Sequence, residues 1–248
     1  MKVTCMVDDA VDGHSLFWGE HGVSFLIETA HGSMLFDTGQ SGTVLLHNLK
    51  EAQVDPARID VLAISHAHYD HTGGLGALLP KTGPVPLFAH PDAFRERFSR
   101  HDGQLKKIGP AFTRDELGRQ VQLRLSDQPQ EALPGVYTTG QIISRAEPEG
   151  RSPRHLIKEG DDWVVDPYRD DMSIVLKVRG GWVLVCGCCH AGLLNTLDHV
   201  RKHFGQRIVA VLGGTHLVDM TDEQMRHIIN VLRGYGPPRL YPLSLIHI

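Results

Sequence analysis

The six residues His66-Ala67-His68-Tyr69-Asp70-His71 constrain this chain more than any other stretch. Four of the six offer the imidazole nitrogens and carboxylate oxygens that zinc and similar ions bind. Side chains two positions apart in an extended segment project to the same side. We therefore expect His66 and His68 to hold one metal ion, and Asp70 and His71, after a bend, to hold a second. A polar surface loop is the alternative, but it explains so dense a set of ligands poorly.

The surrounding pattern indicates a mixed α/β chain, because short apolar runs alternate with amphipathic stretches. Strands are expected at 23–27, 34–36, 59–64, 173–178, 182–186, 208–212 and from 240, with further short candidates at 121–125 and 135–138. Apolar residues at the spacing of one helix face predict helices over 44–50, 193–200 and 225–232, and a further helix is expected to start at 75. Thr221-Asp222-Glu223-Gln224 forms a capping-box pattern before the last helix. The range 81–168 is richer in Pro, Gly and charge, and we interpret it as an elaboration of the domain.

Composition narrows the class of protein. The chain has 248 residues and is 41% hydrophobic, which is enough to bury a core without disulfides. A net charge of −4 without a basic stripe argues against nucleic acid as a partner. No apolar run is long enough to cross a membrane, and the first residues lack the pattern of a signal peptide. Three of the four cysteines fall within four positions, 186–189, so we expect reduced thiols in a cytoplasmic protein.

Further ligands are expected where later strands end. His190 follows the expected strand at 182–186, and His216 follows the one at 208–212. Both are placed to complete the metal centre. Cys188 is an alternative ligand from the same turn as His190, whereas Cys186 and Cys189 are expected to pack in the core.

These stretches resemble the signature of the metallo-β-lactamase superfamily, and the resemblance covers nearly the whole chain. Within it, the chain resembles the branch of 7,8-dihydropterin-6-methyl-4-(β-D-ribofuranosyl)aminobenzene-5'-phosphate synthase-like metal-dependent hydrolases. The motifs that carry this are Glu20-His21-Gly22-Val23-Ser24, Asp37-Thr38-Gly39-Gln40-Ser41, His68-Tyr69-Asp70-His71-Thr72-Gly73-Gly74, Gly187-Cys188-Cys189-His190-Ala191-Gly192 and Gly213-Gly214-Thr215-His216-Leu217. The resemblance implies a four-layer αββα sandwich with its metals at the edge between two sheets. It also implies that Asp37 supports the metal loop from behind.

The chain departs from the superfamily's pattern in two places. The usual threonine-proline-glycine-histidine motif is absent, and the nearest stretch is Thr138-Thr139-Gly140-Gln141. The third ligand of the first metal is therefore expected from the turn that carries Cys188 and His190. After residue 242 the chain reads Leu243-Ser244-Leu245-Ile246-His247-Ile248 where relatives continue with a further metal-site loop. We expect 243–248 to be a non-native tail and the last elements of the sandwich to be missing; a natural short variant that uses His247 is the alternative.

The centre predicts a metal-dependent hydrolase with two divalent ions, expected to be zinc, with iron or manganese as alternatives. A metal-bound hydroxide would attack an ester, phosphoester or lactone of a small molecule, with Asp70 as ligand and proton acceptor. One alternative is a transferase that condenses a pterin with an aminobenzene riboside phosphate. Another is an inactive truncated fragment. A redox di-iron protein is disfavoured, because such relatives usually carry glutamate at the position of His68.

Substrate contacts are expected from two regions. His21 can reach the site, although capping a strand is an equal alternative. The range 144–158 is interpreted as a lid whose Arg151 and Arg154 bind a phosphate of the substrate, with a solvated loop as the alternative. The motif determines the metal centre but not the substrate.

Overall fold

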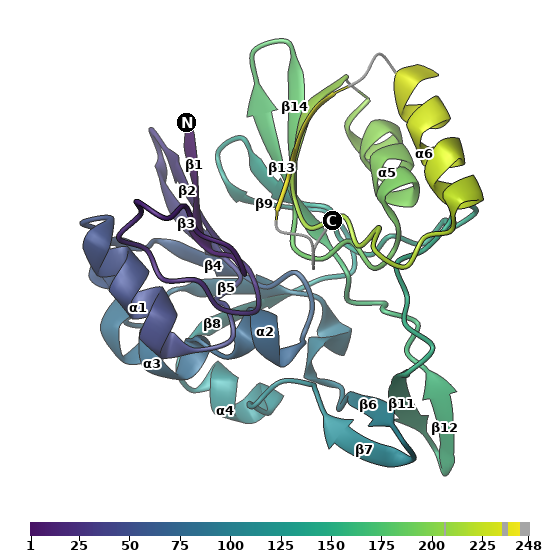
Figure 1. Ribbon diagram of the computed structural model, residues 1–248. Coiled ribbons are helices and arrows are strands. Elements are labelled where there is room, and N and C mark those ends of the chain that lie inside the picture. Colours follow the sequence, from purple (N-terminus) through teal and green to yellow (C-terminus); the bar gives the residue numbers. More distant parts are fainter. Residues whose placement is uncertain (206, 235–237, 244–248) are drawn as a thin grey trace.

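Two six-stranded sheets face each other in the computed structural model, which describes residues 1–205, 207–234 and 238–243 (Figure 1). The first sheet has the order β1 (Lys2–Val7), β2 (Ser24–Thr29), β3 (Gly32–Phe36), β4 (Val61–Ala63), β5 (Pro86–Ala89), β8 (Gln122–Leu125). The second has the order β16 (Arg239–Pro242), β15 (Ile208–Gly213), β14 (Gly181–Cys186), β13 (Ser173–Val178), β10 (Val136–Thr138), β9 (Gln130–Leu133).

Helices cover the outer face of each sheet and complete four layers, as the resemblance implied (Figure 1). Helices α1 (Gly42–Glu51) and α3 (Leu75–Thr82) pack on the first sheet, and α5 (Leu193–Phe204) and α6 (Asp222–Gly234) pack on the second. The short helices are α2 (Tyr69–Thr72) and α4 (Arg114–Gly118), with 3-10 turns η1 (Pro56–Arg58) and η2 (Pro91–Phe94). The expected αββα sandwich is therefore confirmed.

The strands hold these layers together because successive side chains point to opposite faces. In β13, Ile174 and Leu176 enter the core between the sheets, while Val175 enters the core beneath α5 and α6. In β3, Leu35 faces the helices and Phe36 faces the other sheet. Such strands are apolar on both faces, which explains why they read in the sequence as short continuous apolar runs rather than as alternating ones.

The capping box expected before α6 is present. The Thr221 side chain accepts a hydrogen bond from Gln224 N at 3.2 Å, and Gln224 Oε1 accepts one from Thr221 N at 2.9 Å. Strand β1 had no counterpart among the expected elements.

A third, four-stranded sheet projects away from the two large ones (Figure 1). This small sheet has the order β12 (Asp162–Val165), β11 (His155–Glu159), β6 (Phe98–His101), β7 (Gln104–Lys107). The range 81–168 therefore serves two purposes, since its other strands extend both large sheets.

The expected non-native tail, with His247, lies outside the described residues from 244 onward. Leu243, its first residue, packs against the core between the sheets. Within the described residues, no helix is long and apolar enough to cross a membrane.

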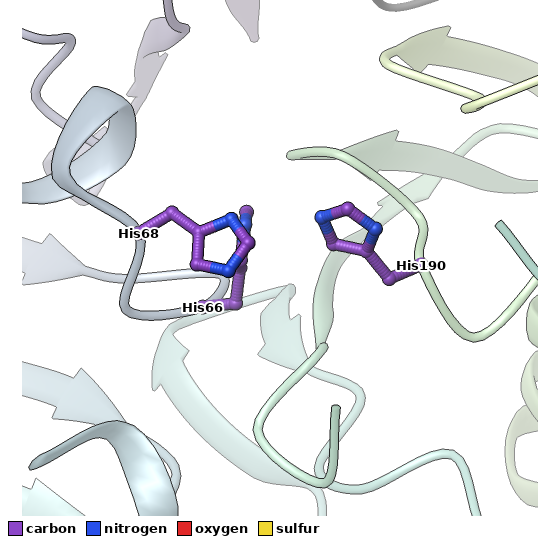
Figure 2. A group of neighbouring side chains, drawn as sticks. All are labelled: His66, His68 and His190. Atoms are coloured by element: carbon purple, nitrogen blue, oxygen red, sulfur yellow. The ribbon is translucent and has the colours of Figure 1, made fainter. Parts of the chain in front are cut away.

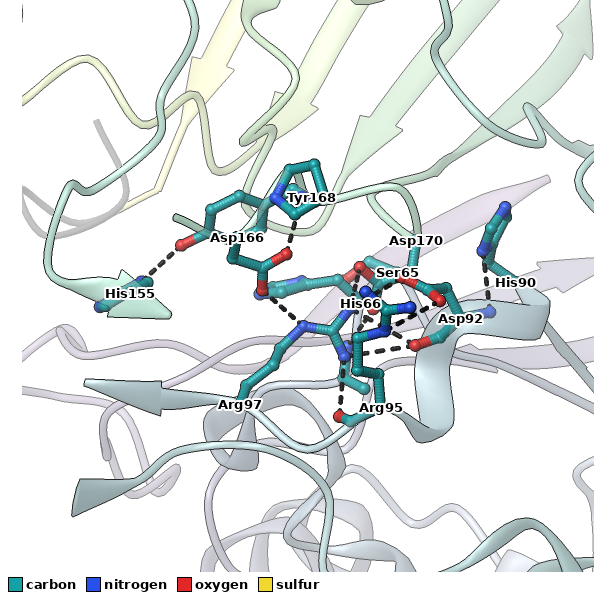
Figure 3. Close-up of polar contacts among 12 residues, drawn as sticks. Ser65, His66, His90, Asp92, Arg95, Arg97, His155, Asp166, Tyr168 and Asp170 are labelled. Atoms are coloured by element: carbon teal, nitrogen blue, oxygen red, sulfur yellow. Dashed lines mark hydrogen bonds and ion pairs between the residues drawn. The ribbon is translucent and has the colours of Figure 1, made fainter. Parts of the chain in front are cut away.

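Arg97 joins the small sheet to the rest of the molecule. Its side chain is fully buried, and its Nε and Nη2 atoms lie 2.7 Å from carboxylate oxygens of Asp166 and Asp170 (Figure 3). Burial alone would lower the pKa of Arg97, but the two carboxylates raise it, so the guanidinium stays charged.

Replacing Arg97 by Met should therefore destabilise the fold strongly. The change leaves two buried carboxylates without their cation, and breaking a buried ion pair from one side typically costs about 3–5 kcal/mol. The matched control is Lys107→Met, because Lys107 pairs with Glu96 in an exposed position and such pairs contribute at most about 1 kcal/mol. Urea unfolding of both variants measures the difference, and a similar small loss in both would contradict this account of Arg97.

Candidate metal centre

Three histidine side chains from two loops point toward one another (Figure 2). His66 and His68 come from the loop after β4, and His190 comes from the turn between β14 and α5. One ring nitrogen from each lies within 4.8 Å of the others. Among the described residues, the buried Nε2 atoms of all three lack a hydrogen-bond partner. Burial lowers the pKa of each ring well below its usual value, so each is neutral and able to bind a metal.

Two further groups of ligand atoms share members with this triad. His66, His71 and Cys188 form one, and Cys188, His190 and His216 form the other, each with ligand atoms within 4.8 Å. Together they make one continuous cluster of imidazole and thiol ligands, a donor set that suits zinc-like ions. Burial raises the pKa of the Cys188 thiol to about 11, and a bound cation would favour its thiolate. The residues present therefore fit a metal centre.

Asp37 supports two of these histidines through a chain of hydrogen bonds. The Ser65 hydroxyl donates to Asp37 Oδ2 at 2.6 Å, so Ser65 Oγ can accept from His66 Nδ1 at 3.0 Å. His71 Nδ1 donates to the same carboxylate oxygen at 2.7 Å. Each bond holds Nδ1 and so directs Nε2 into the cluster. Asp37 thus contacts one histidine of the cluster directly and a second one through Ser65.

Two consecutive aspartates fix the backbones of the two loops. Asp170 Oδ2 accepts from Ala67 N at 2.9 Å, between the first two histidines, and Asp171 Oδ2 accepts from Ala191 N at 2.6 Å, beside His190. Burial raises the pKa of Asp170 to about 7 and that of Asp171 to about 6. Asp170 also binds Arg97, so the small sheet and the metal loop share one carboxylate.

Gly150 holds the opposite side of the cluster. Its carbonyl oxygen accepts from His190 Nδ1 at 2.8 Å, which turns His190 Nε2 inward. A Cβ at this position would lie 2.7 Å from the Cβ of His216. Only glycine allows the chain to pass so close to that side chain.

Asp70 lies beside the cluster rather than in any of the three groups found among the described residues. Its Oδ2 atom is 3.3 Å from His71 Nε2 and 3.5 Å from His21 Nε2. Burial would raise its pKa, but the neighbouring histidines hold the pKa well below its usual range, so Asp70 is ionised. His21 thus reaches the site, through Asp70.

A pocket opens onto the cluster and includes both predicted and unpredicted side chains. Its lining residues are His21, His68, Tyr69, Asp70, Ser99, His101, Lys106, Ile108, His155, Cys188, His190 and His216. Behind it, Tyr168 stacks on His190 with ring centroids 4.0 Å apart, and its hydroxyl is hydrogen-bonded to His155 (Figure 3). Tyr168 has a φ of 47°, a strained backbone that persists where the surroundings enforce it.

The arginines expected to bind phosphate lie elsewhere. Arg151 forms an ion pair with Glu149 at 3.1 Å, and neither Arg151 nor Arg154 lines the pocket. Lys106, which does line the pocket, comes from the small sheet, as does His101.

Sequence reasoning also missed the supporting residues Ser65, Tyr168, Asp170 and Asp171. The paired aspartates directly before an apolar strand were the one local signal, since buried strands rarely begin on carboxylates without partners.

Comparisons with known proteins agree with this geometry. A family model described as the metallo-beta-lactamase superfamily matches residues 18–169, more than half of the chain. The 7,8-dihydropterin-6-methyl-4-(beta-D-ribofuranosyl)-aminobenzene-5'-phosphate synthase of Methanocaldococcus jannaschii is 31% identical, over 97% of this chain and 85% of the relative.

Solved structures show the same fold. One is Tm1679, described as a metal-dependent hydrolase of the beta-lactamase superfamily, with a TM-score of 0.82, 23% identity and coverage of 98% of this chain and 87% of that one. Another is YhfI of Bacillus subtilis, a metallo-beta-lactamase fold protein, with a TM-score of 0.55, 14% identity and coverage of 97% and 85%.

Changing Asp37 to Asn should weaken metal binding while keeping the side chain's shape. An amide nitrogen cannot accept from both Ser65 and His71, and losing such an outer partner typically lowers metal affinity by about 10–100-fold. Competition with a chromophoric chelator measures the affinity. Asp60→Asn is the control, because Asp60 accepts hydrogen bonds from the backbone and the hydroxyl of Ser33 at the surface. Equal affinities in the two variants would refute the role of Asp37.

Changing His190 to Ala should lower the number of bound metal ions per chain by one or more, since two of the three ligand groups contain this side chain. His199→Ala removes another buried histidine that belongs to none of these groups. Elemental analysis should find the unchanged metal content only in the His199 variant. Full occupancy in the His190 variant would show that the ions lie elsewhere.

Proposed function

Because this chain belongs to the metallo-beta-lactamase superfamily, we propose that it is a metal-dependent hydrolase acting on an ester, phosphoester or lactone bond of a small molecule. One observation carries the proposal. The inward Nε2 atoms of His66, His68 and His190 are buried and lack hydrogen-bond partners among the described residues, an arrangement that costs free energy unless an ion binds them. Two of these histidines, His68 and His190, also line an accessible pocket.

The proposed cofactor is a pair of divalent ions, with zinc first and iron or manganese as alternatives. When bound, such ions activate water at neutral pH and neutralise negative charge that develops on the substrate. The ligands proposed are His66, His68, His71, His190, His216 and Cys188, with Asp70 at the edge of the set.

The chain's own groups handle the proton and the substrate. Asp70 is ionised and open to the pocket, so it can accept the proton of the attacking water and return it to the leaving group. His21 lies 3.5 Å from Asp70 and 3.1 Å from Asp9, and so orients the carboxylate. Tyr168, behind the pocket, holds the ring of His190 in place by stacking on it.

A second candidate is a transferase that joins a pterin to a phosphorylated aminobenzene riboside. The similarity to the synthase of Methanocaldococcus jannaschii, over 97% of this chain, supports it. The same centre would then orient a phosphorylated substrate instead of activating water. We also propose a cytoplasmic location, which suits four free cysteines.

The first test is metal content and hydrolysis in the purified chain and in His68→Ala. We expect about two metal equivalents per chain, together with turnover of a nitrophenyl ester, a nitrophenyl phosphodiester or a γ-lactone. In His68→Ala, metal affinity and turnover should fall by more than the roughly 10–100-fold that is typical when a residue supporting a metal ligand is removed. His199→Ala should behave like the unaltered chain. Condensation of a dihydropterin diphosphate with an aminobenzene riboside phosphate, without hydrolysis, would favour the transferase; absence of bound metal would refute both.

A further inference from the structure

One face of the small sheet presents a row of polar side chains to the pocket. The register pairs His155 in β11 with Ser99 in β6, and Ser99 with Lys106 in β7. Directly paired residues of neighbouring strands project to the same face. All three residues line the pocket, as does His101, two positions after Ser99 on the same face.

The opposite face of the small sheet packs within the sheet itself. On that face, Leu156 in β11 pairs with Phe98 in β6, and Phe98 pairs with Lys107 in β7. Phe98 packs edge-on against Trp163 with ring centroids 5.1 Å apart, and Lys107 forms an ion pair with Glu96 at 2.9 Å. The sheet thus uses one face for its own packing and turns the other toward the pocket.

Lys106 differs from Lys107 in its partners. Among the described residues it has no carboxylate within ion-pair distance, and its ammonium group lies 5.7 Å from the centre of the Tyr69 ring, at the pocket wall. Asp70 is the sole carboxylate among the lining residues, and it is already surrounded by histidines. The outer half of the pocket therefore offers a cation, a hydroxyl and an imidazole without a competing acid.

The row of His155, Ser99 and Lys106 begins beside the histidine cluster and leads away from it across the three strands. The ring of His155 lies edge-on to His68 with centroids 5.2 Å apart. Neighbouring strands are about 4.8 Å apart, so the strand of Lys106 lies roughly 10 Å beyond that of His155. A group bound at Lys106 would therefore be separated from the reacting bond by roughly 10 Å, a span that an elongated substrate is needed to bridge.

We propose that Ser99, His101 and Lys106 form the binding site for the phosphate of an elongated phosphorylated substrate whose reacting bond lies at the cluster of His66, His68 and His190. This inference rests on the proposed function and specifies its substrate class. Phosphate suits the row because it can accept from a hydroxyl, an imidazole and an ammonium group at once. The phosphate site is therefore assigned to the small sheet and not to Arg151 and Arg154.

The test uses the metal-loaded chain and methyl β-ribofuranoside 5-phosphate as the probe. Its unphosphorylated counterpart and the 5-carboxylate are the comparison ligands. Acetylation of lysines, located by mass spectrometry, reports protection at Lys106 and Lys107 in the same peptide. We expect the phosphorylated probe to slow acetylation of Lys106, to leave Lys107 unchanged, and to protect far better than either comparison ligand.

Binding constants from calorimetry provide the second measurement. Lys106→Ala should lower the affinity for the phosphorylated probe by about tenfold, because one hydrogen bond to a charged group is lost. The affinity of Lys107→Ala for the phosphorylated probe should lie within about twofold of that of the unaltered chain, because an exposed ion pair contributes little. Unchanged affinity in Lys106→Ala, or equal protection by the carboxylate, would overturn the proposal. Neither readout needs turnover, so a failure of the phosphate site is distinguishable from a failure of hydrolysis in the His68→Ala comparison.

Discussion

The centre depends on how each buried imidazole is held. The Nδ1 atom of His66 is held by the Ser65 hydroxyl, that of His71 by the Asp37 carboxylate, and that of His190 by the backbone carbonyl of Gly150. Their Nε2 atoms are thereby committed to the interior. The buried Nε2 atoms of His66 and His190 have no hydrogen-bond partner among the described residues, which raises the free energy of the metal-free fold, and a bound metal ion would offset that cost. Stability and metal occupancy are therefore one linked property of this chain.

The sandwich brings the histidine-bearing loops together at one edge of its sheets. Parallel strands end at a common edge, so β4 delivers the first histidines, and β14 and β15 deliver His190 and His216. The carboxylates of Asp170 and Asp171 then connect the two sides through backbone amides. Arg97 extends this connection to the small sheet, so the pocket-lining side chains of that sheet are fixed to the histidine loop.

The fold and the ligand-rich loop could be predicted from the sequence because their signals are local. The ligand-rich loop is contiguous, and strands buried on both faces leave apolar runs that can be recognised without a structure. The supporting residues could not be found in this way. Tyr168 and Arg97 act through contacts with residues far along the chain, and no periodicity marks them. The cation at the pocket could not be found from the sequence for a related reason: charge density singled out Arg151 and Arg154, whereas strand alternation places Lys106 among the pocket-lining residues.

The division of the ligands between the two halves of the chain also sets the order in which the centre can form. His66, His68 and His71 leave the ribosome well before His190 and His216, and contacts so distant in sequence form late because a long loop must close first. A nascent chain that has made the first sheet holds only half of a coordination sphere. The complete cluster can therefore form only once the two halves of the chain have docked.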